Sequence, residues 1–326
     1  MSRAPLLTMI MIVKDEADYL TGCLNSVETV INELVIVDTG SSDTTCGIAE
    51  QYGAQLFSFP WNDSFADARN EALKHANGKW ILFLDADERL TPESRSIISS
   101  LLLDNDAMAF DVKIRSKLKS SWHWGEYPRL FRNHPFIRFE GRIHEQIMPS
   151  IRRLRGKVKK SDVIIDHVGY AVDDDRMQAK LKRNEYLLHL QISDQPNDSY
   201  SHYCLGNVYD QMNETELAIR YYQNAAELDQ QQPKIFYLLG NKFLETAQYW
   251  EAENNYQRAH ELAPDVYEVL YNLAVAQIKQ SRYDAAIQNF EKALKLRPQD
   301  ERIQRYIQVC SKMMAQQRLQ QQVPVI

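Results

Sequence analysis

The first half of the chain alternates short apolar runs with segments of helical periodicity. The runs are rich in β-branched residues, which is typical of strands buried on both faces. They cover residues 6–13, 34–38, 54–59 and 80–84. The segments between them place apolar residues on one helical face, with candidate caps at Ser42 or Asp43 and at Asp63 or Ser64. This alternation predicts an α/β fold with a mostly parallel, Rossmann-like sheet covered by helices.

The second half of the chain repeats with a period of 34 residues. Leu205-Gly206, Leu239-Gly240 and Leu273-Ala274 share this spacing. The same spacing relates three further sets: Ala218, Ala252 and Ala286; Tyr222, Tyr256 and Phe290; and Ala225, Ala259 and Ala293. Together with Pro264 and Pro298, these positions resemble the tetratricopeptide repeat, a unit of two antiparallel helices.

Repeats of this kind bury their apolar faces by stacking on their neighbours, so the array needs capping segments at both ends. The repeats are expected at about residues 199–232, 233–266 and 267–300. Helices within residues 176–192 and 301–321 can supply the caps. The second half is therefore predicted to be an all-α solenoid.

A change of composition marks the boundary between the halves. Nine of the eleven glycines lie at or before Gly169, and the acidic run from Tyr170 to Asp175 follows the last strand-like segment. We therefore predict an α/β domain over residues 1–175 and a helical repeat domain over residues 176–326.

The composition is that of an ordinary globular protein, with 44% hydrophobic and 25% charged residues. The net charge of −6 offers no reason to expect a nucleic-acid partner, and no apolar run is long enough to span a membrane. The four cysteines are far apart and form no CxxC pair. A reducing, cytoplasmic compartment is the simplest expectation.

Charge is distributed unevenly within the first half. Acidic side chains prevail over residues 1–112, whereas residues 113–160 hold 14 basic and 3 acidic side chains. This contrast fits a site that binds both a cation and a polyanion, and it equally fits a solvated basic face.

Acidic residues stand where two of the predicted strands end. Asp38 ends the second strand, and Asp85-Ala86-Asp87-Glu88 follows the fourth. The carboxyl ends of parallel strands meet at one edge of a sheet, where ligands bind. A DxD pair there can hold a divalent cation that bridges two phosphates. The alternative is that Asp87 is only a turn or cap residue, because Thr91-Pro92-Glu93 is typical of a helix start.

Four motifs occur in a fixed order between residues 13 and 88. They are Val13-Lys14-Asp15-Glu16, the segment from Val37 to Asp43, Asp67-Ala68-Arg69-Asn70, and the segment from Leu84 to Glu88. This series closely resembles glycosyltransferase family 2, of the GT-A fold. The resemblance continues through residues 127–133 and 141–145. It is closest to the branch containing sublancin-type peptide S-glycosyltransferases and lipopolysaccharide core glucosyltransferases, and the helical repeats favour the former.

The family resemblance implies a nucleotide-diphosphate sugar donor, usually linked to UDP, and a divalent metal, Mn²⁺ or Mg²⁺. It also implies direct displacement with inversion at the anomeric carbon. The positions that match donor-binding residues are Glu16, Asp38, Asp67, Arg69, Asn70 and Asp85. Asp87 matches the main metal ligand, with Asp85 beside it. A metal there would stabilise the negative charge of the departing nucleoside diphosphate.

Two later residues complete the expected site. An inverting displacement needs a base for the acceptor proton, and Glu145 is the candidate. The family often has an acidic pair at this point, whereas this chain has His144-Glu145, so an acceptor-orienting His144 and a surface ion pair remain alternatives. His167 resembles the late histidine that completes the metal shell of some GT-A enzymes. Its alternative is a purely structural role.

Three aromatic residues, Trp122, Trp124 and Tyr127, flank a glycine in a segment expected to be a loop near the site. Such rings stack against sugars, and they equally well wedge a loop against a core.

The repeats suggest a polypeptide acceptor, because helical arrays of this kind grip extended peptides, or else a homodimer. Three functional classes remain open: a transferase acting on a peptide or protein, a transferase acting on an envelope glycan or lipid-linked acceptor, and a scaffold with a degenerate transferase domain. The acidic residues gathered at one edge argue against the third.

Overall fold

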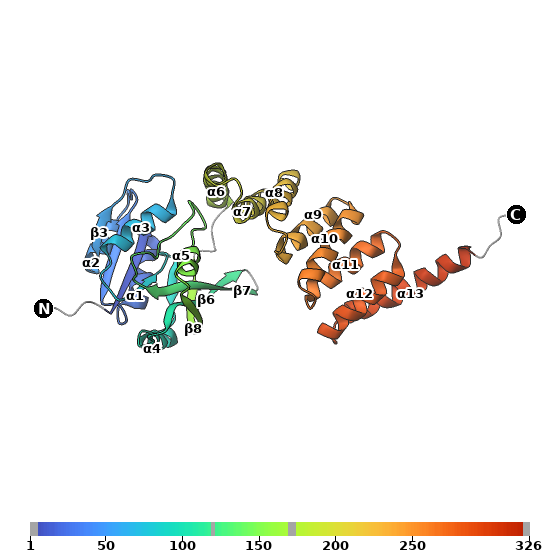
Figure 1. Ribbon diagram of the computed structural model, residues 1–326, viewed down its shortest axis with the longest axis horizontal. Helices are drawn as coiled ribbons and strands as arrows, with labels where there is room; N and C mark the ends of the chain where they lie inside the picture. The colour runs from blue at the N-terminus through green and yellow to red at the C-terminus, as the bar shows by residue number, and fades with distance from the viewer. Residues whose placement is uncertain (1–5, 119–120, 169–173, 322–326) are drawn as a thin grey trace. The chain divides into compact units, whose positions relative to one another are not determined.

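The computed structural model describes residues 6–118, 121–168 and 174–321, and the chain forms two compact units, residues 1–179 and 180–326 (Figure 1). Gly169 and Tyr170, part of the predicted boundary, lie outside the described residues.

The first unit is built on one sheet of eight strands. The strands are β1 (Leu7–Val13), β2 (Glu33–Asp38), β3 (Gln55–Ser58), β4 (Trp80–Phe83), β5 (Glu88–Leu90), β6 (Ala107–Leu118), β7 (Ser121–Arg132) and β8 (Lys157–His167). Its helices are α1 (Ala17–Val27), α2 (Thr45–Gln51), α3 (Phe65–His75), α4 (Pro92–Leu101) and α5 (Met148–Arg153). All four strands predicted before residue 100 are confirmed, as β1 to β4.

The strand order is β3-β2-β1-β4-β7-β6-β8-β5. Strands β1 to β4 are mutually parallel, as predicted, and β6 is parallel to β8. The other neighbours, β4–β7, β7–β6 and β8–β5, are antiparallel, so the sheet is mixed. The register pairs Val13 with Asp38, which brings the ends of β1 and β2 to the same edge.

Apolar side chains cover both faces of this sheet. On one face, β1, β2 and β4 pack against α1, α2 and α4, with Trp80 wholly buried. On the other, Ile10, Val35 and Phe131 pack against α3 and α5. Burial on both faces explains why the parallel strands are continuous apolar runs rather than alternating ones.

The segment predicted to be an aromatic loop is instead strand β7, the second strand of a long hairpin with β6. Trp122, Trp124 and Tyr127 are each about half exposed. The guanidinium of Arg115 lies 5.1 Å from the centre of the Trp122 ring and 6.0 Å from that of Trp124. Polar residues occupy both faces of this part of the hairpin, so its sequence lacks the apolar alternation that identifies a half-buried strand.

One of the two predicted helix caps is confirmed. The hydroxyl of Ser64, the residue before α3, accepts a hydrogen bond from the Asp67 amide at 3.1 Å. The cap of α2 is Thr44 rather than Ser42 or Asp43. Asp43 nevertheless accepts a hydrogen bond from the Thr45 amide at 2.9 Å, so its side chain still serves the start of that helix.

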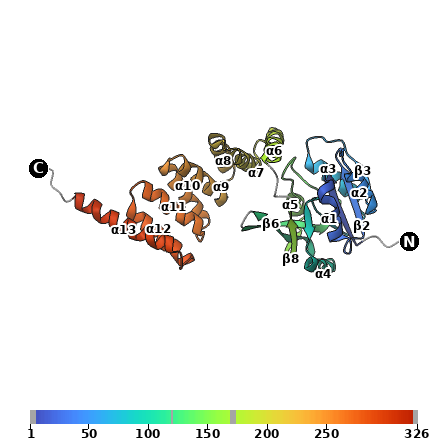
Figure 2. The ribbon, with the colours of Figure 1, turned by 180° about the vertical axis from the view of Figure 1, so that it is seen from behind.

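The second unit consists of successive helical hairpins (Figures 1 and 2). Its helices are α6 (Asp174–Asp194), which begins before the unit boundary, α7 (Ser199–Gln211), α8 (Thr215–Leu228), α9 (Pro233–Glu245), α10 (Tyr249–Leu262), α11 (Tyr267–Lys279), α12 (Tyr283–Leu296) and α13 (Glu301–Gln321). Each predicted repeat is one pair from α7 to α12, and α6 and α13 occupy the predicted capping positions.

Small residues allow the two helices of each repeat to approach closely. A Cβ atom added at Gly206 would lie 2.5 Å from the Tyr222 ring, and one at Gly240 would lie 2.5 Å from the Tyr256 ring. The 34-residue spacing of glycine and aromatic residues therefore reflects one contact made in successive repeats.

Candidate active site

The polar residues of the α/β unit gather at the carboxyl ends of β1, β2 and β4. Asp38, at the end of β2, is buried and accepts hydrogen bonds from the amides of Gly40 and Ser41, each at 3.1 Å. Gly40 has φ +109°, a conformation that side chains other than glycine rarely adopt, so this turn requires a glycine. Asp38 therefore shapes the loop that follows β2.

Glu16 begins helix α1 at the same edge. Burial, and after it the negative charges of Asp87 and Asp85, raise the pKa of its carboxyl group to about 7. The two aspartates contribute to this shift because nearby like charges disfavour the ionised form of Glu16. The structure thus brings Glu16 and the two aspartates of the DxD motif into one electrostatic environment.

The pairing of β5 with β8 brings the DxD turn to His167. Glu88 lies opposite His167 in this antiparallel pair, and the Val168 amide donates to the Asp87 carbonyl at 2.9 Å. As a result, Nε2 of His167 lies 2.9 Å from Oδ2 of Asp87. Burial disfavours the charged imidazole, but the hydrogen bond and charge of Asp87 outweigh this effect and raise the pKa of His167.

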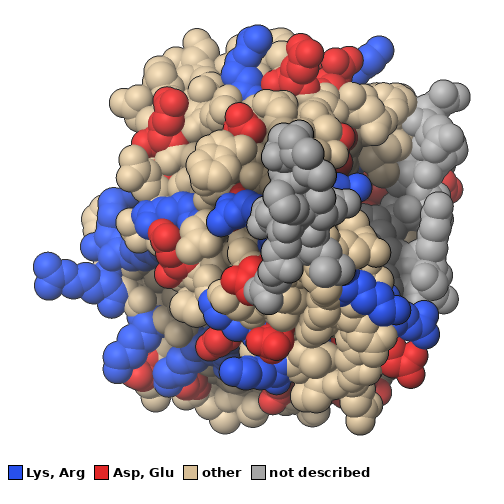
Figure 3. All heavy atoms as spheres, turned by 90° about the vertical axis from the view of Figure 1, so that its right-hand side faces the viewer, with Lys and Arg blue, Asp and Glu red and all other residues tan. Residues whose placement is uncertain are grey.

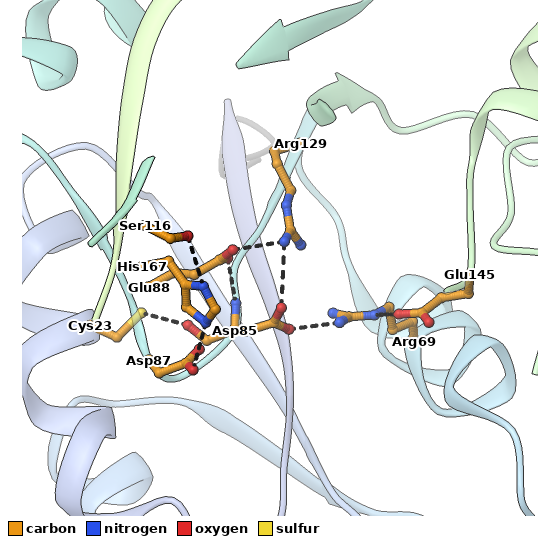
Figure 4. A network of polar contacts seen from close by, with 9 residues as sticks. All are labelled: Cys23, Arg69, Asp85, Asp87, Glu88, Ser116, Arg129, Glu145 and His167. Atoms are coloured by element: carbon orange, nitrogen blue, oxygen red, sulfur yellow. Dashed lines mark hydrogen bonds and ion pairs between the residues drawn. The ribbon is translucent and has the colours of Figure 1, made fainter. Parts of the chain in front are cut away.

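The other aspartate of the DxD motif points into a chain of ion pairs (Figure 4). Asp85 accepts a hydrogen bond from Nη2 of Arg69 at 2.6 Å, and Nε of Arg69 donates to Glu145. Arg69 is only 6% exposed, and these two carboxylates balance its buried charge. Glu145, on the segment before α5, is thereby connected to the DxD turn through one side chain.

A second arginine closes the network on the opposite side of Asp85. Nη2 of Arg129 lies 2.7 Å from Glu88 Oε1 and 3.4 Å from Asp85 Oδ2. Burial alone would raise the pKa of Asp85, but Arg69 and Arg129 outweigh it and hold that pKa well below its usual range. Asp85 is therefore held ionised by two arginines.

Asn70 and Asp67 make local contacts on α3. The amide group of Asn70 donates to the Phe139 carbonyl at 2.9 Å and accepts from the Phe139 amide at 2.8 Å. Asp67 accepts from the side chain of Asn62 at 2.8 Å. In this structure Asn70 anchors the backbone of the segment that leads to Glu145.

Comparison with known proteins identifies the family of this domain. Residues 8–169 match the model of glycosyl transferase family 2. The N-terminal domain is a family 2 glycosyltransferase domain. Residues 200–232 and 267–300 match models of the tetratricopeptide repeat, so the second unit is a repeat domain of that family.

Three curated relatives are similar to this chain over part of its length. A TPR repeat-containing protein of Synechococcus elongatus is 34% identical over 236 residues, which cover 71% of this chain and 59% of the relative. The SPbeta prophage-derived glycosyltransferase SunS of Bacillus subtilis is 25% identical over 224 residues, which cover 68% of this chain and 53% of SunS. The lipopolysaccharide core biosynthesis glycosyltransferase LpsC of Rhizobium meliloti is 31% identical over 160 residues, which cover 45% of this chain and 58% of LpsC. The chain thus spans little more than half the length of these relatives.

The family 2 domain presents two of the three predicted metal ligands side by side. Asp87 and His167 face each other, whereas Asp85 is engaged by Arg69 and Arg129. Across the described ranges, no three His, Cys, Asp or Glu side chains are arranged to hold a metal ion by themselves. Over the same ranges, no helix is both long and apolar enough to cross a membrane.

Sequence reasoning missed two members of the network of the family 2 domain. Glu88 is 3% exposed, pairs with Arg129 and accepts a hydrogen bond from the Asp85 amide at 2.9 Å. Burial raises the pKa of its carboxyl group to about 7, although Arg129 opposes this. Ser116, on β6, lies with its hydroxyl 3.3 Å from Nδ1 of His167. The position of Glu88 directly after the DxD motif is the one feature of the sequence that could have placed it in the site. No feature of the sequence indicates Ser116.

The basic segment of the family 2 domain is largely neutralised by neighbouring acids. Lys113 pairs with Asp162, and Lys160 pairs with Glu126. Figure 3 views the molecule from the right-hand side of Figure 1, the side of helix α13, and there too acidic and basic side chains are interspersed among uncharged ones. Arg129 is the member of this segment that reaches the candidate site through an ion pair with the DxD turn.

Proposed function

We propose that this chain is a metal-dependent, inverting glycosyltransferase that moves a sugar from a nucleotide-diphosphate donor to a polypeptide. The observation that carries the proposal is the arrangement of Asp87, His167 and Glu145 around Asp85 at the carboxyl edge of a family 2 sheet. In this arrangement, Asp87 and His167 would form a cation site on one side of the DxD turn, and Glu145 supplies a carboxylate on the other.

The residues fit a divalent cation. Oδ2 of Asp87 and Nε2 of His167 lie 2.9 Å apart, and a carboxylate oxygen and an imidazole nitrogen are ligand atoms that suit Mn²⁺. In this network, three carboxylates (Asp85, Glu88 and Glu145) face two arginines, and Glu16 and Asp87 add to the negative charge. Asp87 and His167 would hold the metal. A metal bound there would neutralise charge on the nucleoside diphosphate as it leaves.

The donor would lie along the edge formed by the loops after β1 and β2. Glu16 and Asp38 stand on these loops, where carboxylates can accept hydrogen bonds from a base or a ribose. Asp85 is held ionised by its arginines and would act on the donor rather than on the metal. Arg69 and Asn70 support Asp85 and the Glu145 segment, so we assign them positioning roles.

Glu145 would take the proton from the acceptor. In the transfer, the acceptor oxygen or sulfur bonds to the anomeric carbon while the bond from that carbon to the diphosphate oxygen breaks, and the acceptor proton passes to the base. Oε1 of Glu145 accepts from Arg69, and Oε2 has no hydrogen-bond partner among the described residues. That oxygen would be the one that receives the proton.

The repeat domain favours a polypeptide acceptor, because helical repeats bind peptides and other proteins. The second candidate, an envelope glycan, is favoured by one observation: the family 2 domain is similar to LpsC, which is named for lipopolysaccharide core biosynthesis. The two candidates share the donor site and differ only in the acceptor.

The test is transfer by the full chain from UDP-, GDP- and dTDP-sugars, with Mn²⁺, to Ser-, Thr- and Cys-containing peptides and, separately, to oligosaccharide acceptors. A peptide whose mass increases by one sugar, with wild type and not with Asp87→Asn, is the expected result. Transfer to oligosaccharides alone would overturn the polypeptide assignment. Turnover of no donor with any acceptor would overturn the transferase assignment.

A further inference from the structure

Helix α1 contacts the DxD turn along one of its faces. The residues of this face are Tyr19, Gly22, Cys23 and Ser26, whose spacing places them on one side of a helix. The thiol of Cys23 donates to the Asp85 carbonyl at 3.5 Å, and the Leu90 amide donates to the Ser26 hydroxyl at 3.0 Å. The segment that carries the DxD motif is therefore held against α1 at several points.

Arg89 makes the densest of these contacts. Its Nη1 atom donates to the carbonyls of Ala86 at 2.7 Å and Glu88 at 2.9 Å, and its Nη2 atom donates to the carbonyl of Tyr19 at 2.6 Å. Two of these acceptors belong to the DxD turn and the third to α1. A charged donor strengthens each hydrogen bond, so one guanidinium ties the turn to the helix.

Gly22 provides the space that this guanidinium occupies. A Cβ atom at position 22 would lie 2.5 Å from Nε and 2.6 Å from Nη2 of Arg89. Any larger residue there would push the guanidinium away from its acceptors. Gly47, an exposed glycine of α2, has open space around its Cβ position and offers a matched comparison.

We propose that Arg89 is a positioning residue that fixes the DxD turn relative to the start of α1, and that Gly22 is the residue that admits it. Glu16 stands at that start and Asp87 stands in that turn, so the contact sets how the two carboxylates face a shared ligand. The identity of the ligand rests on the proposed function, but the contact itself does not.

Hydrogen exchange of the full chain tests the contact without any ligand. The amides of Asp85, Glu88 and Val168 report on the turn, because each bonds within it or to it. In Gly22→Ala and in Arg89→Met we expect them to exchange about tenfold faster, with β1 and β2 unchanged and Gly47→Ala like wild type. Since both variants act on one contact, the double variant should exchange no faster than Arg89→Met alone. Turn amides that exchange as in wild type, additive effects, or faster exchange across the whole sheet would overturn the proposal.

Calorimetry with UDP and Mn²⁺ tests the consequence for the site. We expect Gly22→Ala and Arg89→Met to weaken UDP binding about tenfold, and Gly47→Ala to bind as wild type does. A loosened turn with unchanged UDP affinity would overturn the positioning role. If the wild-type chain binds no UDP, GDP and dTDP are titrated in its place. A chain that binds none of the three would contradict the proposed function instead, and hydrogen exchange would still decide whether Arg89 and Gly22 hold the turn.

Discussion

Nε2 of His167 lies 2.9 Å from Oδ2 of Asp87, although the two residues are 80 positions apart in the sequence. The antiparallel pairing of β5 with β8 creates this contact, because it sets Glu88 opposite His167. Asp85 points instead to Arg69 and Arg129. The two aspartates of one DxD motif thus have different partners, which separates the His167 side, where we propose the cation, from an arginine-held side.

Replacing His167 by alanine should weaken Mn²⁺ binding, because the imidazole would be one of two protein ligands. We expect a loss of at least about tenfold in affinity, measured from free Mn²⁺ by electron paramagnetic resonance. His134→Ala, outside the site, should bind Mn²⁺ as wild type does. Equal affinity in His167→Ala and wild type would contradict the assignment of His167 as a ligand.

Replacing Glu145 by glutamine separates its two roles. The glutamine carbonyl can still accept the hydrogen bond from Arg69, but it cannot take the acceptor proton. If Glu145 is the base, transfer should fall by about a hundredfold or more, while donor affinity stays the same. Transfer at nearly the wild-type rate would leave Glu145 with only its contact to Arg69.

We expect Asn70→Ala to lower the free energy of unfolding and to leave the affinity for the nucleotide unchanged. It removes both hydrogen bonds to the Phe139 backbone and leaves that buried amide and carbonyl without their partner. We expect a loss of about 1–3 kcal/mol in the free energy of unfolding, measured by urea titration against Asn105→Ala. Unchanged stability together with weaker UDP binding would favour direct contact with the donor instead.

The glycines of the repeats should tolerate alanine poorly. Gly206→Ala would drive a methyl group into the Tyr222 ring, and overpacking of this kind costs about 1–3 kcal/mol. Tyr222 and Tyr256 donate to Asn207 and Asn241, each at 2.8 Å, so neither ring can shift without loss. The third repeat has alanine at position 274 and Phe290, which has no hydroxyl, facing it. Thermal melts should therefore show a lower transition for Gly206→Ala than for Gly47→Ala; equal transitions would contradict this packing account.

The sequence was most informative where burial or backbone geometry imposes a pattern. Strands β1 to β4 are apolar because helices cover both faces, and the repeats recur because one helix contact recurs, so both were predicted. The sheet beyond residue 107 was largely missed. Strand β7 carries polar and aromatic residues on both faces, and Trp122, Trp124 and Tyr127 therefore gave no strand signal.

The candidate site is likewise divided between residues that a local sequence pattern indicates and contacts that it does not. Asp38, Asp85 and Asp87 were predicted to lie at the carboxyl edge of the sheet because each stands at or just after the end of a recognisable strand, and the structure places them there. The contact of Arg129 with Glu88 and that of Ser116 with His167 depend on strand pairing between distant segments, which local pattern does not encode. Arg89 was missed for a similar reason, since its acceptors are backbone carbonyls and backbone carries no residue-specific signal.

The most direct test of the account is slow hydrolysis of UDP-, GDP- and dTDP-sugars by the full chain, with Mn²⁺ and with a chelator. Asp87→Asn is the decisive variant, and Asp162→Asn, whose partner is the surface residue Lys113, is its matched control. We predict Mn²⁺-dependent release of one sugar that Asp162→Asn retains and Asp87→Asn loses. Release that persists in the chelator or in Asp87→Asn would contradict a metal-dependent transferase centred on this turn.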